Sequence, residues 1–503
     1  MSEPLIVGVD LGTTNTKAAV FDLAGMPLAT ASQDLPTTRP RPGWVEQNPD
    51  DWWGSCLAVL RTLAKSVDMA RVHSVGIVSQ VNTHAFVDSA LRPVVPAIVW
   101  QDQRCGEVAR ELDQRISAAE RASVWGSHFT IDSSYLVSRC AWLAAHDPAS
   151  WAATRWVLLP KDYVTARLTG SVVTDFISAI GLTRGDGSGY LSAAVGLLEG
   201  LGRRLPPLAA PATPIGPVAS DDVEFLSGAT VVTGTMDAWG NLYGSGSIAP
   251  GQAILVGGTS EVVCVVSDKR TEAGPGIIAF PPMDGLVVHA GPTQAGGDAF
   301  RWWTQTCEST VERSLAAAAA SPPGSNGIVF LPHLLGERAP LWDADVRATF
   351  LGLSSSTTLG ELTRAVLEGV AFSARELMDA AELSAGLPAE RIILSGGTAN
   401  SDLWCQIKAD VLQRTFHRLA FRNSGVLGAA ILGGVGAGIF DTPADAAKMA
   451  IHVDRVFEPN ASTTELYDHL YHAYRDAYHA LSAVHGQLSS WRTRFAQLSE
   501  KSS

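Results

Sequence analysis

Residues Val7–Lys17 read V-G-V-D-L-G-T-T-N-T-K, so an apolar strand runs directly into a carboxylate, a glycine and a series of hydroxyl and amide side chains. The strand signal begins at Leu5, and Gly12 allows a tight reversal into a hairpin. Outward-pointing backbone amides in such a turn form a concave anion site. The hydroxyls expected to join them belong to Thr13, Thr14 and Thr16. The stretch therefore predicts a phosphate-binding turn.

Asp10 has a different predicted role from the hydroxyls that follow it. A carboxylate beside a phosphate would repel the anion unless a hard divalent cation lay between them. We therefore interpret Asp10 as an anchor for Mg²⁺, either directly or through water. Taken alone, the stretch is equally compatible with an ordinary surface hairpin that carries a solvated aspartate.

A second stretch repeats this plan about half a chain away. Residues 253–260 read A-I-L-V-G-G-T-S, again an apolar strand followed by a glycine turn and hydroxyls, and residues 262–266 resume a strand pattern. Two such hairpins indicate a duplicated architecture that holds the phosphate tail of a nucleotide between its halves.

Length, composition and charge restrict the class of protein. The 503 residues exceed one hydrophobic core and predict two or three domains. A net charge of −13 argues against nucleic-acid and anionic-membrane partners. The six cysteines include no C-x-x-C pair, and the strand pattern begins too close to the first residue for a signal peptide, so we expect a cytoplasmic protein. The uncharged stretch 423–440 is short for a membrane span and predicts a buried helix.

Strand-like and helix-like segments alternate along the chain, which predicts α/β layers. In the first half, strands are expected at 5–9, 17–22 and 75–79 and a helix at 49–67. In the second half, helices are expected at 359–383, 403–413 and 464–498. The histidines of the last helix lack the carboxylate or cysteine neighbours of a metal site, so we interpret this helix as a packing element.

Four ordered motifs make the chain resemble the FGGY carbohydrate kinases, a family of the actin, Hsp70 and sugar kinase superfamily, and its xylulokinase-like pentulose kinases. They are D-L-G-T-T-N-T-K at 10–17, L-V-G-G-T-S at 255–260, G-I-V-F-L-P-H-L-L-G-E-R-A-P at 327–340 and S-G-G-T-A-N at 395–400. The resemblance implies an α/β fold of two duplicated ribonuclease H-like (actin-like ATPase) domains with a catalytic cleft between them. It implies a sugar-binding domain at 1–248, an ATP-binding domain at 249–455 and a helical extension at 456–503.

Asp237 is the predicted catalytic base. A sugar hydroxyl that attacks the γ-phosphate must lose a proton, and a nearby carboxylate is the usual acceptor. Asp237 follows a strand and precedes Ala238-Trp239-Gly240-Asn241, the context in which the family carries its base. An aspartate that caps the next helix is the alternative.

The resemblance also implies the residues that bind Mg-ATP. The expected nucleotide contacts are Gly12, Thr13, Thr14, Asn15, Lys17, Gly258, Thr259, Ser260, Gly396, Gly397 and Asn400. Asp10 is the expected metal ligand. For Glu337 and Arg338 in the third motif, a structural ion pair is at least as good an interpretation as catalysis, and we assign them no chemical role.

The expected sugar contacts, besides Asp237, are Gln80, Val81, Asn82, Thr83, His84, Asp102 and Arg104. Xylulose kinases carry Met-His after the glutamine and glycerol kinases Arg-Glu, whereas this chain carries Val81-Asn82. His84 could equally be a core histidine. Asp102 and Arg104 could equally pair with each other.

The favoured function is ATP-dependent phosphorylation of a hydroxyl of a small ketose, above all a pentulose such as D-xylulose. The alternatives are a kinase of erythritol, ribitol, glycerol, ribulose or gluconate, a nucleotide-driven machine resembling actin or Hsp70, and a sugar-binding regulator. The expected partner is the small-molecule substrate alone. Since family members are often dimers, the resemblance also allows a homodimer.

Overall fold

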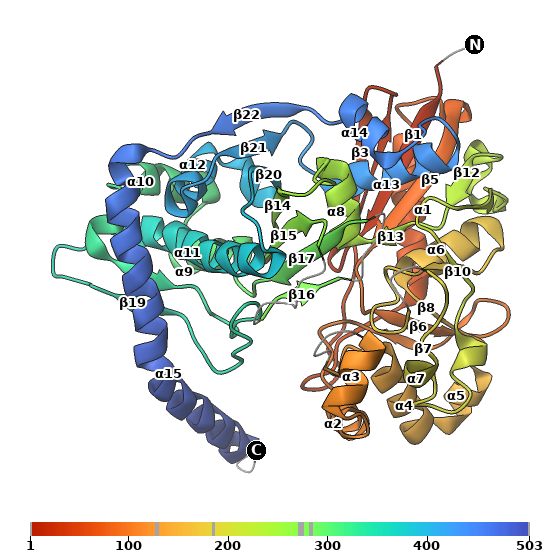
Figure 1. Ribbon diagram of the computed structural model, residues 1–503, viewed down its shortest axis with the longest axis horizontal. Coiled ribbons are helices and arrows are strands. Elements are labelled where there is room, and N and C mark those ends of the chain that lie inside the picture. Colours follow the sequence, from red (N-terminus) through yellow and green to blue (C-terminus); the bar gives the residue numbers. More distant parts are fainter. Residues whose placement is uncertain (1–2, 126–129, 184–186, 270–275, 281–284, 501–503) are drawn as a thin grey trace. The chain divides into compact units, whose positions relative to one another are not determined.

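The computed structural model describes residues 3–125, 130–183, 187–269, 276–280 and 285–500, and its internal contacts divide them into two compact units. Unit 1 contains residues 3–246 and 423–451. Unit 2 contains residues 247–280, 285–422 and 452–500. Figure 1 labels the elements of both units.

The described part of unit 1 contains a main sheet, a four-stranded sheet, the two-stranded sheet β10-β9 and the helices around them. Its strands are β1 (Leu5–Leu11), β2 (Asn15–Phe21), β3 (Pro27–Asp34), β4 (Glu46–Gln47), β5 (Val72–Ser79), β6 (His84–Val87), β7 (Pro93–Ile98), β8 (Trp156–Leu158), β9 (Thr174–Asp175), β10 (Leu208–Ala209), β11 (Pro214–Pro217), β12 (Thr230–Val232) and β13 (Thr235–Met236). Its helices are α1 (Pro49–Leu63), α2 (Gly106–Gln114), α3 (Ala118–Trp125), α4 (Leu136–His146), α5 (Pro148–Ala153), α6 (Pro160–Thr169), α7 (Ser192–Val195), α8 (Asp237–Ser245), α13 (Ser424–Gly436) and α14 (Pro443–Ala450).

The main sheet of unit 1 has the strand order β11-β12-β5-β1-β2-β3, and β13 pairs with the end of β5. Strands β1, β2 and β3 form an antiparallel meander, whereas β5 is parallel to β1 and β12 is parallel to β5. The predicted hairpin is confirmed, with Asp10 opposite Lys17. A smaller sheet, in the order β4-β7-β6-β8, carries the residues that follow β5.

Helix α13 returns from late in the chain to cover the main sheet of unit 1, and Figure 1 shows it beside β1 and β5. A Cβ on Gly8 would lie 2.0 Å from the carbonyl oxygen of Val426, and one on Gly76 would lie 1.7 Å from that of Ala429. These glycines let the helix backbone approach the strands, and the prediction of a buried helix is confirmed. Residues 423–451 therefore pack with unit 1, although the sequence assigns them to the second domain.

Unit 2 contains the remaining elements. Its strands are β14 (Gln252–Gly257), β15 (Glu261–Ser267), β16 (Ile278–Ala279), β17 (Val287–Pro292), β18 (Val329–Leu331), β19 (Thr349–Leu351), β20 (Arg391–Gly396), β21 (Phe416–Leu419) and β22 (Val453–Phe457). Its helices are α9 (Gly297–Thr306), α10 (Val311–Ala319), α11 (Leu359–Ala385), α12 (Asp402–Leu412) and α15 (Thr464–Glu500).

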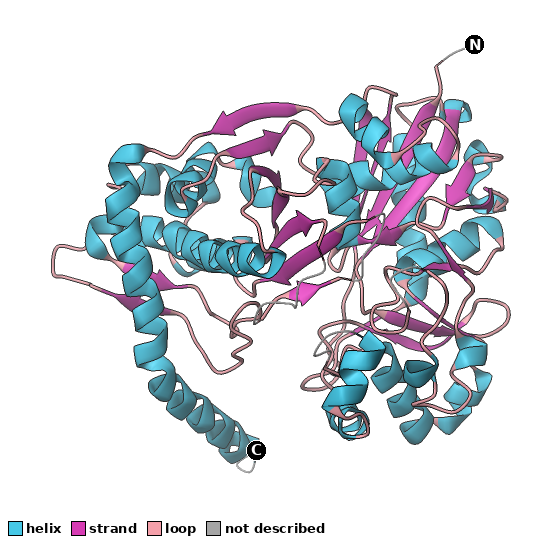
Figure 2. Cartoon of the chain, in the orientation of Figure 1, coloured by secondary structure: helices cyan, strands magenta, loops and turns pink. Residues whose placement is uncertain are grey.

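The main sheet of unit 2 repeats the topology of unit 1. Its order is β16-β17-β15-β14-β20-β21-β22, in which β17, β15 and β14 are antiparallel neighbours and β20 and β21 continue in parallel from β14. This core matches β3-β2-β1-β5-β12 strand for strand. Figure 2 shows helices around the strands in each unit. The predicted duplicated α/β architecture is thus confirmed.

The long last helix, α15, packs against α11, α12 and β18 of unit 2. Tyr467 and Tyr474 are fully buried, and the Tyr478 hydroxyl donates to Asp343 at 3.0 Å. The interpretation of this helix as a packing element is therefore confirmed. In the described part of the chain, no helix is both long and apolar enough to cross a membrane.

Candidate active site

Asp237 is the first residue of α8 and follows directly from β13, the short strand at the end of β5. Its Oδ1 accepts a hydrogen bond of 2.8 Å from the backbone amide of Ala238. Burial raises the pKa of the Asp237 carboxyl to about 7, and repulsion from the carboxylate of Asp10 adds to the shift. A carboxyl with such a pKa can both accept and release a proton near neutral pH.

Asp10 lies near the end of β1, beside Asp237. Burial also raises the pKa of Asp10, to about 6, while the charge of Lys17 opposes the shift. Two neighbouring carboxylates, faced by one lysine, form an acidic pair that favours a cation. The turn geometry that brings the two aspartates together comes from the parallel pairing of β1, β5 and β13.

Helices α8 and α13 hold the acidic pair in place. The Asn241 side chain donates to the backbone carbonyl of Asp237 at 2.8 Å, and the Ser424 hydroxyl donates to Asn241 at 2.5 Å. A Cβ on Gly425 would lie 2.7 Å from Oδ2 of Asp10. Glycine at the start of α13 therefore leaves the space that this carboxylate occupies.

The first predicted phosphate turn is bonded to the predicted sugar-binding stretch. The Thr13 hydroxyl donates to Oε1 of Gln80 at 3.0 Å and accepts from Nε1 of Trp100 at 2.9 Å. The expectation for Thr16 is wrong, because its buried hydroxyl bonds to the hydroxyl of Ser55 at 2.7 Å. Residues alternate between the two faces of β2, and Thr16 lies on the face toward α1.

The other residues of this turn remain open to solvent or half-buried. The amide of Gly12 donates to the carbonyl of Asn15 at 3.0 Å and closes the turn. Thr14 is exposed, and Asn15 and Lys17 are half-buried. Their roles toward ATP stay predictions.

The predicted sugar-binding residues occupy the loop between β5 and β6. Gln80 is buried and bonds to the side chains of Gln47 and Thr83. Val81 is half-buried beside it, and Asn82 has a left-handed backbone with φ of 53° and donates to the Ser134 hydroxyl at 3.3 Å. The loop is therefore held by its own polar network.

His84 is a buried histidine at the start of β6. Its Nδ1 lies 3.0 Å from Nη1 of Arg139, which also donates to the carbonyls of Asn82 and Ile98. Burial and the charge of Arg139 hold the pKa of His84 well below its usual range. The ring is neutral, so His84 can offer a hydrogen bond but no charge.

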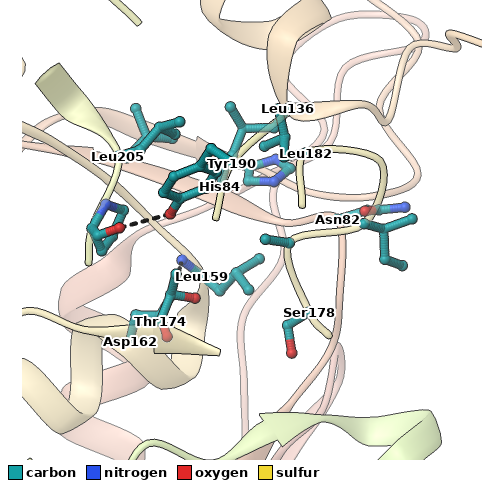
Figure 3. A pocket seen from close by; sticks show the side chains of 14 residues that line it. Asn82, His84, Leu136, Leu159, Asp162, Thr174, Ser178, Leu182, Tyr190 and Leu205 are labelled. Carbon is teal, nitrogen blue, oxygen red and sulfur yellow. Dashed lines mark hydrogen bonds between the residues drawn. The ribbon is translucent and has the colours of Figure 1, made fainter. Parts of the chain in front are cut away.

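Asn82 and His84 also line a pocket in unit 1 (Figure 3). The figure shows Ser178, Asp162 and Tyr190 at the same pocket, together with leucine side chains. The structure therefore brings two of the predicted sugar contacts to a concave site whose other walls were not anticipated.

Asp102 and Arg104 pair with each other. Nη2 of Arg104 lies 2.7 Å from Asp102, and its Nη1 lies 2.8 Å from Glu46. The guanidinium also lies 3.6 Å from the ring centroid of Trp44, a cation–π contact. Asp102 is fully buried and accepts from the amide of Val45 at 2.5 Å. The pairing alternative is observed, and a contact of either residue with substrate stays a prediction.

In unit 2, the second phosphate turn and the predicted adenosine motif are neighbours. Strands β14 and β20 are parallel, with Gly257 opposite Gly396. Gly396 has φ of 84°, and a Cβ there would lie 2.4 Å from the carbonyl oxygen of Gly257. The residues exposed beside this contact are Gly258, Thr259, Gly397 and Asn400. Two motifs that lie far apart in the sequence thus form one surface.

Glu337 and Arg338 contact different partners. Glu337 accepts from Nδ1 of His333 at 2.8 Å, whereas Nη2 of Arg338 donates to the Ser260 hydroxyl at 3.1 Å and to the Thr293 carbonyl at 2.6 Å. Arg338 therefore reaches the second phosphate turn. The motif at 327–340 contains this arginine, but no feature of the sequence indicates that it contacts Ser260 and Thr293.

Sequence reasoning missed a buried ion pair beneath the same turn. Nζ of Lys408 on α12 pairs with Glu261, the first residue of β15, and donates to the Thr398 hydroxyl at 3.0 Å. Both charged side chains are almost completely buried. A lone lysine in an otherwise amphipathic helix gives no sign of such a partner 147 residues away.

The two halves of the chain match the two domains of one protein family. The model of the N-terminal domain of the FGGY family of carbohydrate kinases matches residues 5–186, and that of the C-terminal domain matches residues 253–437. The chain belongs to the FGGY family of carbohydrate kinases. It is therefore a sugar kinase, and this class excludes the alternatives of a non-kinase machine and a regulator.

Curated relatives align over nearly the whole chain. A xylulose kinase from Staphylococcus epidermidis is 29% identical over 95% of this chain and 97% of its own. A glycerol kinase from Citrifermentans bemidjiense is 30% identical over 90% of this chain and 94% of its own.

Solved structures agree with the fold. A gluconate kinase from Lactobacillus acidophilus has a TM-score of 0.86 at 25% identity, over 97% of this chain and all of its own. A xylulose kinase from the same organism has a TM-score of 0.85 at 25% identity, over 96% of this chain and all of its own.

Proposed function

We propose that this protein transfers the γ-phosphoryl group of ATP to a hydroxyl of a pentulose such as D-xylulose, with Asp237 as the general base. The observation that carries the proposal is the carboxyl of Asp237, whose pKa of about 7 suits proton transfer at neutral pH. The similarity to xylulose kinases over nearly the whole chain supports the pentulose. The glycerol and gluconate kinases among the similar proteins make those substrates the main alternatives.

Asp237 has one carboxylate oxygen available for the reaction. Oδ1 is engaged by the amide of Ala238, so Oδ2 would accept the proton of the acceptor hydroxyl. Asn241, bonded to the backbone of Asp237, fixes the first turn of α8 and thereby the direction of the carboxylate. Fixing the base in this way lowers the entropy cost of proton transfer.

The acidic pair fits Mg²⁺, the usual partner of ATP. No group of three or more potential metal ligands occurs among the described residues. Mg²⁺ needs only one or two protein carboxylates, because phosphates and waters supply its other ligands. We assign this role to Asp10, while Mg²⁺ would supply charge neutralisation for the phosphates.

The nucleotide contacts are proposed for unit 2 and for the first turn of unit 1. In unit 2, Thr259 and Ser260 would bind phosphates, with Arg338 bonded to Ser260, and Gly397 would lie against the adenosine. In unit 1, the exposed hydroxyl of Thr14 would join the backbone amides of its turn. The acceptor is assigned to unit 1, where Asp237 and the loop containing Asn82 lie.

We propose a cytoplasmic location, which the six free cysteines support. The substrate is the expected partner, and a homodimer stays a prediction.

Release of ADP over a panel of acceptors tests the proposal. The panel contains D-xylulose, ribulose, erythrulose, glycerol, erythritol, ribitol and gluconate, and D-xylulose or another pentulose should give the highest kcat/KM. The Asp237→Asn variant should lose acceptor-dependent turnover by about 10²- to 10⁴-fold while it binds ATP as the wild type does. Asp221→Asn, an exposed aspartate of the same unit, is the matched control. Normal turnover by Asp237→Asn would refute the role of this residue.

A further inference from the structure

The pocket lined by Asn82 and His84 contains a polar group for which the proposed mechanism has no use. The Ser178 side chain is 2% exposed, and its hydroxyl has no hydrogen-bond partner among the described residues. Figure 3 labels Ser178 and His84 among the side chains that line the pocket. A buried hydroxyl without a partner is destabilising, because it has lost its hydration and gained no hydrogen bond. Ser178 is therefore an open position for a ligand's hydrogen bond.

His84 provides a second group for hydrogen bonding to a ligand, and its bond with Arg139 determines which ring nitrogen can donate. A guanidinium can only donate, so Nδ1 of His84 accepts from Arg139 at 3.0 Å. The neutral ring then carries its proton on Nε2. The pocket thus combines a hydroxyl, which donates or accepts, with an imidazole N–H, which donates.

The walls of the pocket disfavour an anion. Its lining contains one charged side chain, Asp162, and no lysine or arginine among the described residues. The cation nearest to that aspartate, Lys161, is already bound to Asp162 at 2.6 Å and to Asp175 at 2.8 Å. An entering carboxylate would lose its hydration and meet no cation in the lining, because the guanidinium of Arg139 is engaged by His84 and by the carbonyls of Asn82 and Ile98. The remaining lining is largely apolar, with Leu136, Leu159, Leu182 and Leu205 among its members.

A buried polar network leads from this pocket to β13, the strand that precedes the proposed base in unit 1. Asp175, the second partner of Lys161, accepts from the Thr235 hydroxyl at 2.9 Å. Thr235 lies in β13, two residues before Asp237. The pocket is therefore joined through buried polar groups to the strand that positions Asp237.

We propose that this pocket binds the uncharged hydroxymethyl end of the acceptor, remote from the hydroxyl that reacts, with Ser178 as the partner of its terminal hydroxyl and His84 as a further hydrogen-bond donor to the sugar. The inference rests on the proposed function and deepens it. It selects neutral ketoses and polyols over aldonates such as gluconate. It also selects acceptors with a terminal hydroxyl over their terminal-deoxy analogues, because a missing hydroxyl would leave the buried Ser178 hydroxyl unpaired.

Calorimetric titration without nucleotide tests the pocket directly. D-Xylulose should bind the wild type about tenfold or more tightly than 1-deoxy-D-xylulose, and gluconate should show the weakest binding. Ser178→Ala should bring the ratio of the two Kd values toward one. Ser138→Ala is the matched control, because Ser138 on α4 is equally buried and unpartnered but does not line the pocket. Equal Kd values for the two sugars in the wild type, or an unchanged ratio in Ser178→Ala, would overturn the inference.

A second variant keeps the test valid should Ser178→Ala not fold. Leu182→Phe fills the pocket and should weaken binding of D-xylulose at least about tenfold, with binding of ADP unchanged. Turnover separates the two proposals. Selective sugar binding without acceptor-dependent ADP release would contradict the proposed function and support the pocket. Turnover of D-xylulose above the other acceptors, together with equal binding of 1-deoxy-D-xylulose, would contradict the pocket alone.

Discussion

Units 1 and 2 have the same order of strands in their main sheets, but the acidic residue at the hairpin has a different environment in each unit. In unit 1, Asp10 and Asp237 lie beside each other without a buried cation in the described part of the chain, and burial together with their mutual repulsion raises the pKa of Asp237. In unit 2, Glu261 is fully buried and neutralised by Lys408. The same scaffold thus carries reactive carboxylates in one copy and a structural ion pair in the other. The difference lies in whether a cation from a neighbouring helix reaches the carboxylate.

The largest expected effect on stability concerns the lysine that interacts with the acidic residue at each hairpin, Lys408 in unit 2 and Lys17 in unit 1. Lys408→Met leaves the buried Glu261 without its cation and should lower the free energy of unfolding by about 3–5 kcal/mol. Lys17→Met, beside half-buried Asp10, should lower it by less than about 1 kcal/mol. Urea unfolding of both variants measures the difference, and equal losses would show that the two carboxylates are not treated differently.

A double variant sharpens this contrast. Glu261→Gln combined with Lys408→Met removes both charges, so most of the stability lost in Lys408→Met should return, to within about 1–2 kcal/mol of the wild type. Urea unfolding of the double variant is the measurement. If it remains as unstable as Lys408→Met, packing of the lysine stem rather than the unpaired charge determines the loss.

The stability of unit 1 should depend on pH through Asp237. Its folded pKa, about 7, exceeds the ordinary value of 3.8, so the folded state binds the proton more tightly than the unfolded state. The stabilisation is present at low pH and is lost as pH rises from about 4 to about 7. Asp237→Asn should therefore be more stable than the wild type at pH 8 by about 1–3 kcal/mol and should lose this advantage toward pH 5. Unfolding curves at pH 8 and pH 5 measure the difference in free energy of unfolding between the variant and the wild type. A difference that stays the same at both pH values would exclude titration of this carboxyl.

The smallest expected effect is a shift in the pH dependence of catalysis. Asp237 must be deprotonated to act as base, so wild-type kcat/KM should rise with pH up to about 7. Asp10→Asn removes the repulsion and should move this limb toward lower pH, by about half a unit to one unit. The pH profile of residual activity measures the shift. A limb that stays in place would show that burial alone raises the pKa of Asp237.

Much of the fold could be predicted because its signals are local. The pattern of apolar residues predicted β1 and the helix α11, and the uncharged Gly-rich stretch predicted the buried helix α13. The unit to which α13 belongs could not be predicted, since this depends on its contact with Gly8 and Gly76. Close approach between distant backbones leaves no periodic pattern in the sequence.

The candidate site was predictable in its residue types more than in its contacts. Asp237 follows a strand and begins a helix, as expected from its flanking residues. The predicted role of Thr16 at the anion site is wrong, because a run of hydroxyl residues does not show which of them points toward the core from β2. Ser178 carries no signal at all, and only its burial without a partner draws attention to it.

The sequence by itself determined the family, the two hairpins and the chemistry available at their turns, because these depend on residues within a few positions of one another. The tertiary structure decided which charges meet. It set Asp237 beside Asp10, joined Lys408 to Glu261 and left the Ser178 hydroxyl at a pocket with no partner among the residues that the structure describes. Burial and pairing arise from packing between segments far apart in the chain, so they govern pKa and reactivity in ways that local pattern does not record.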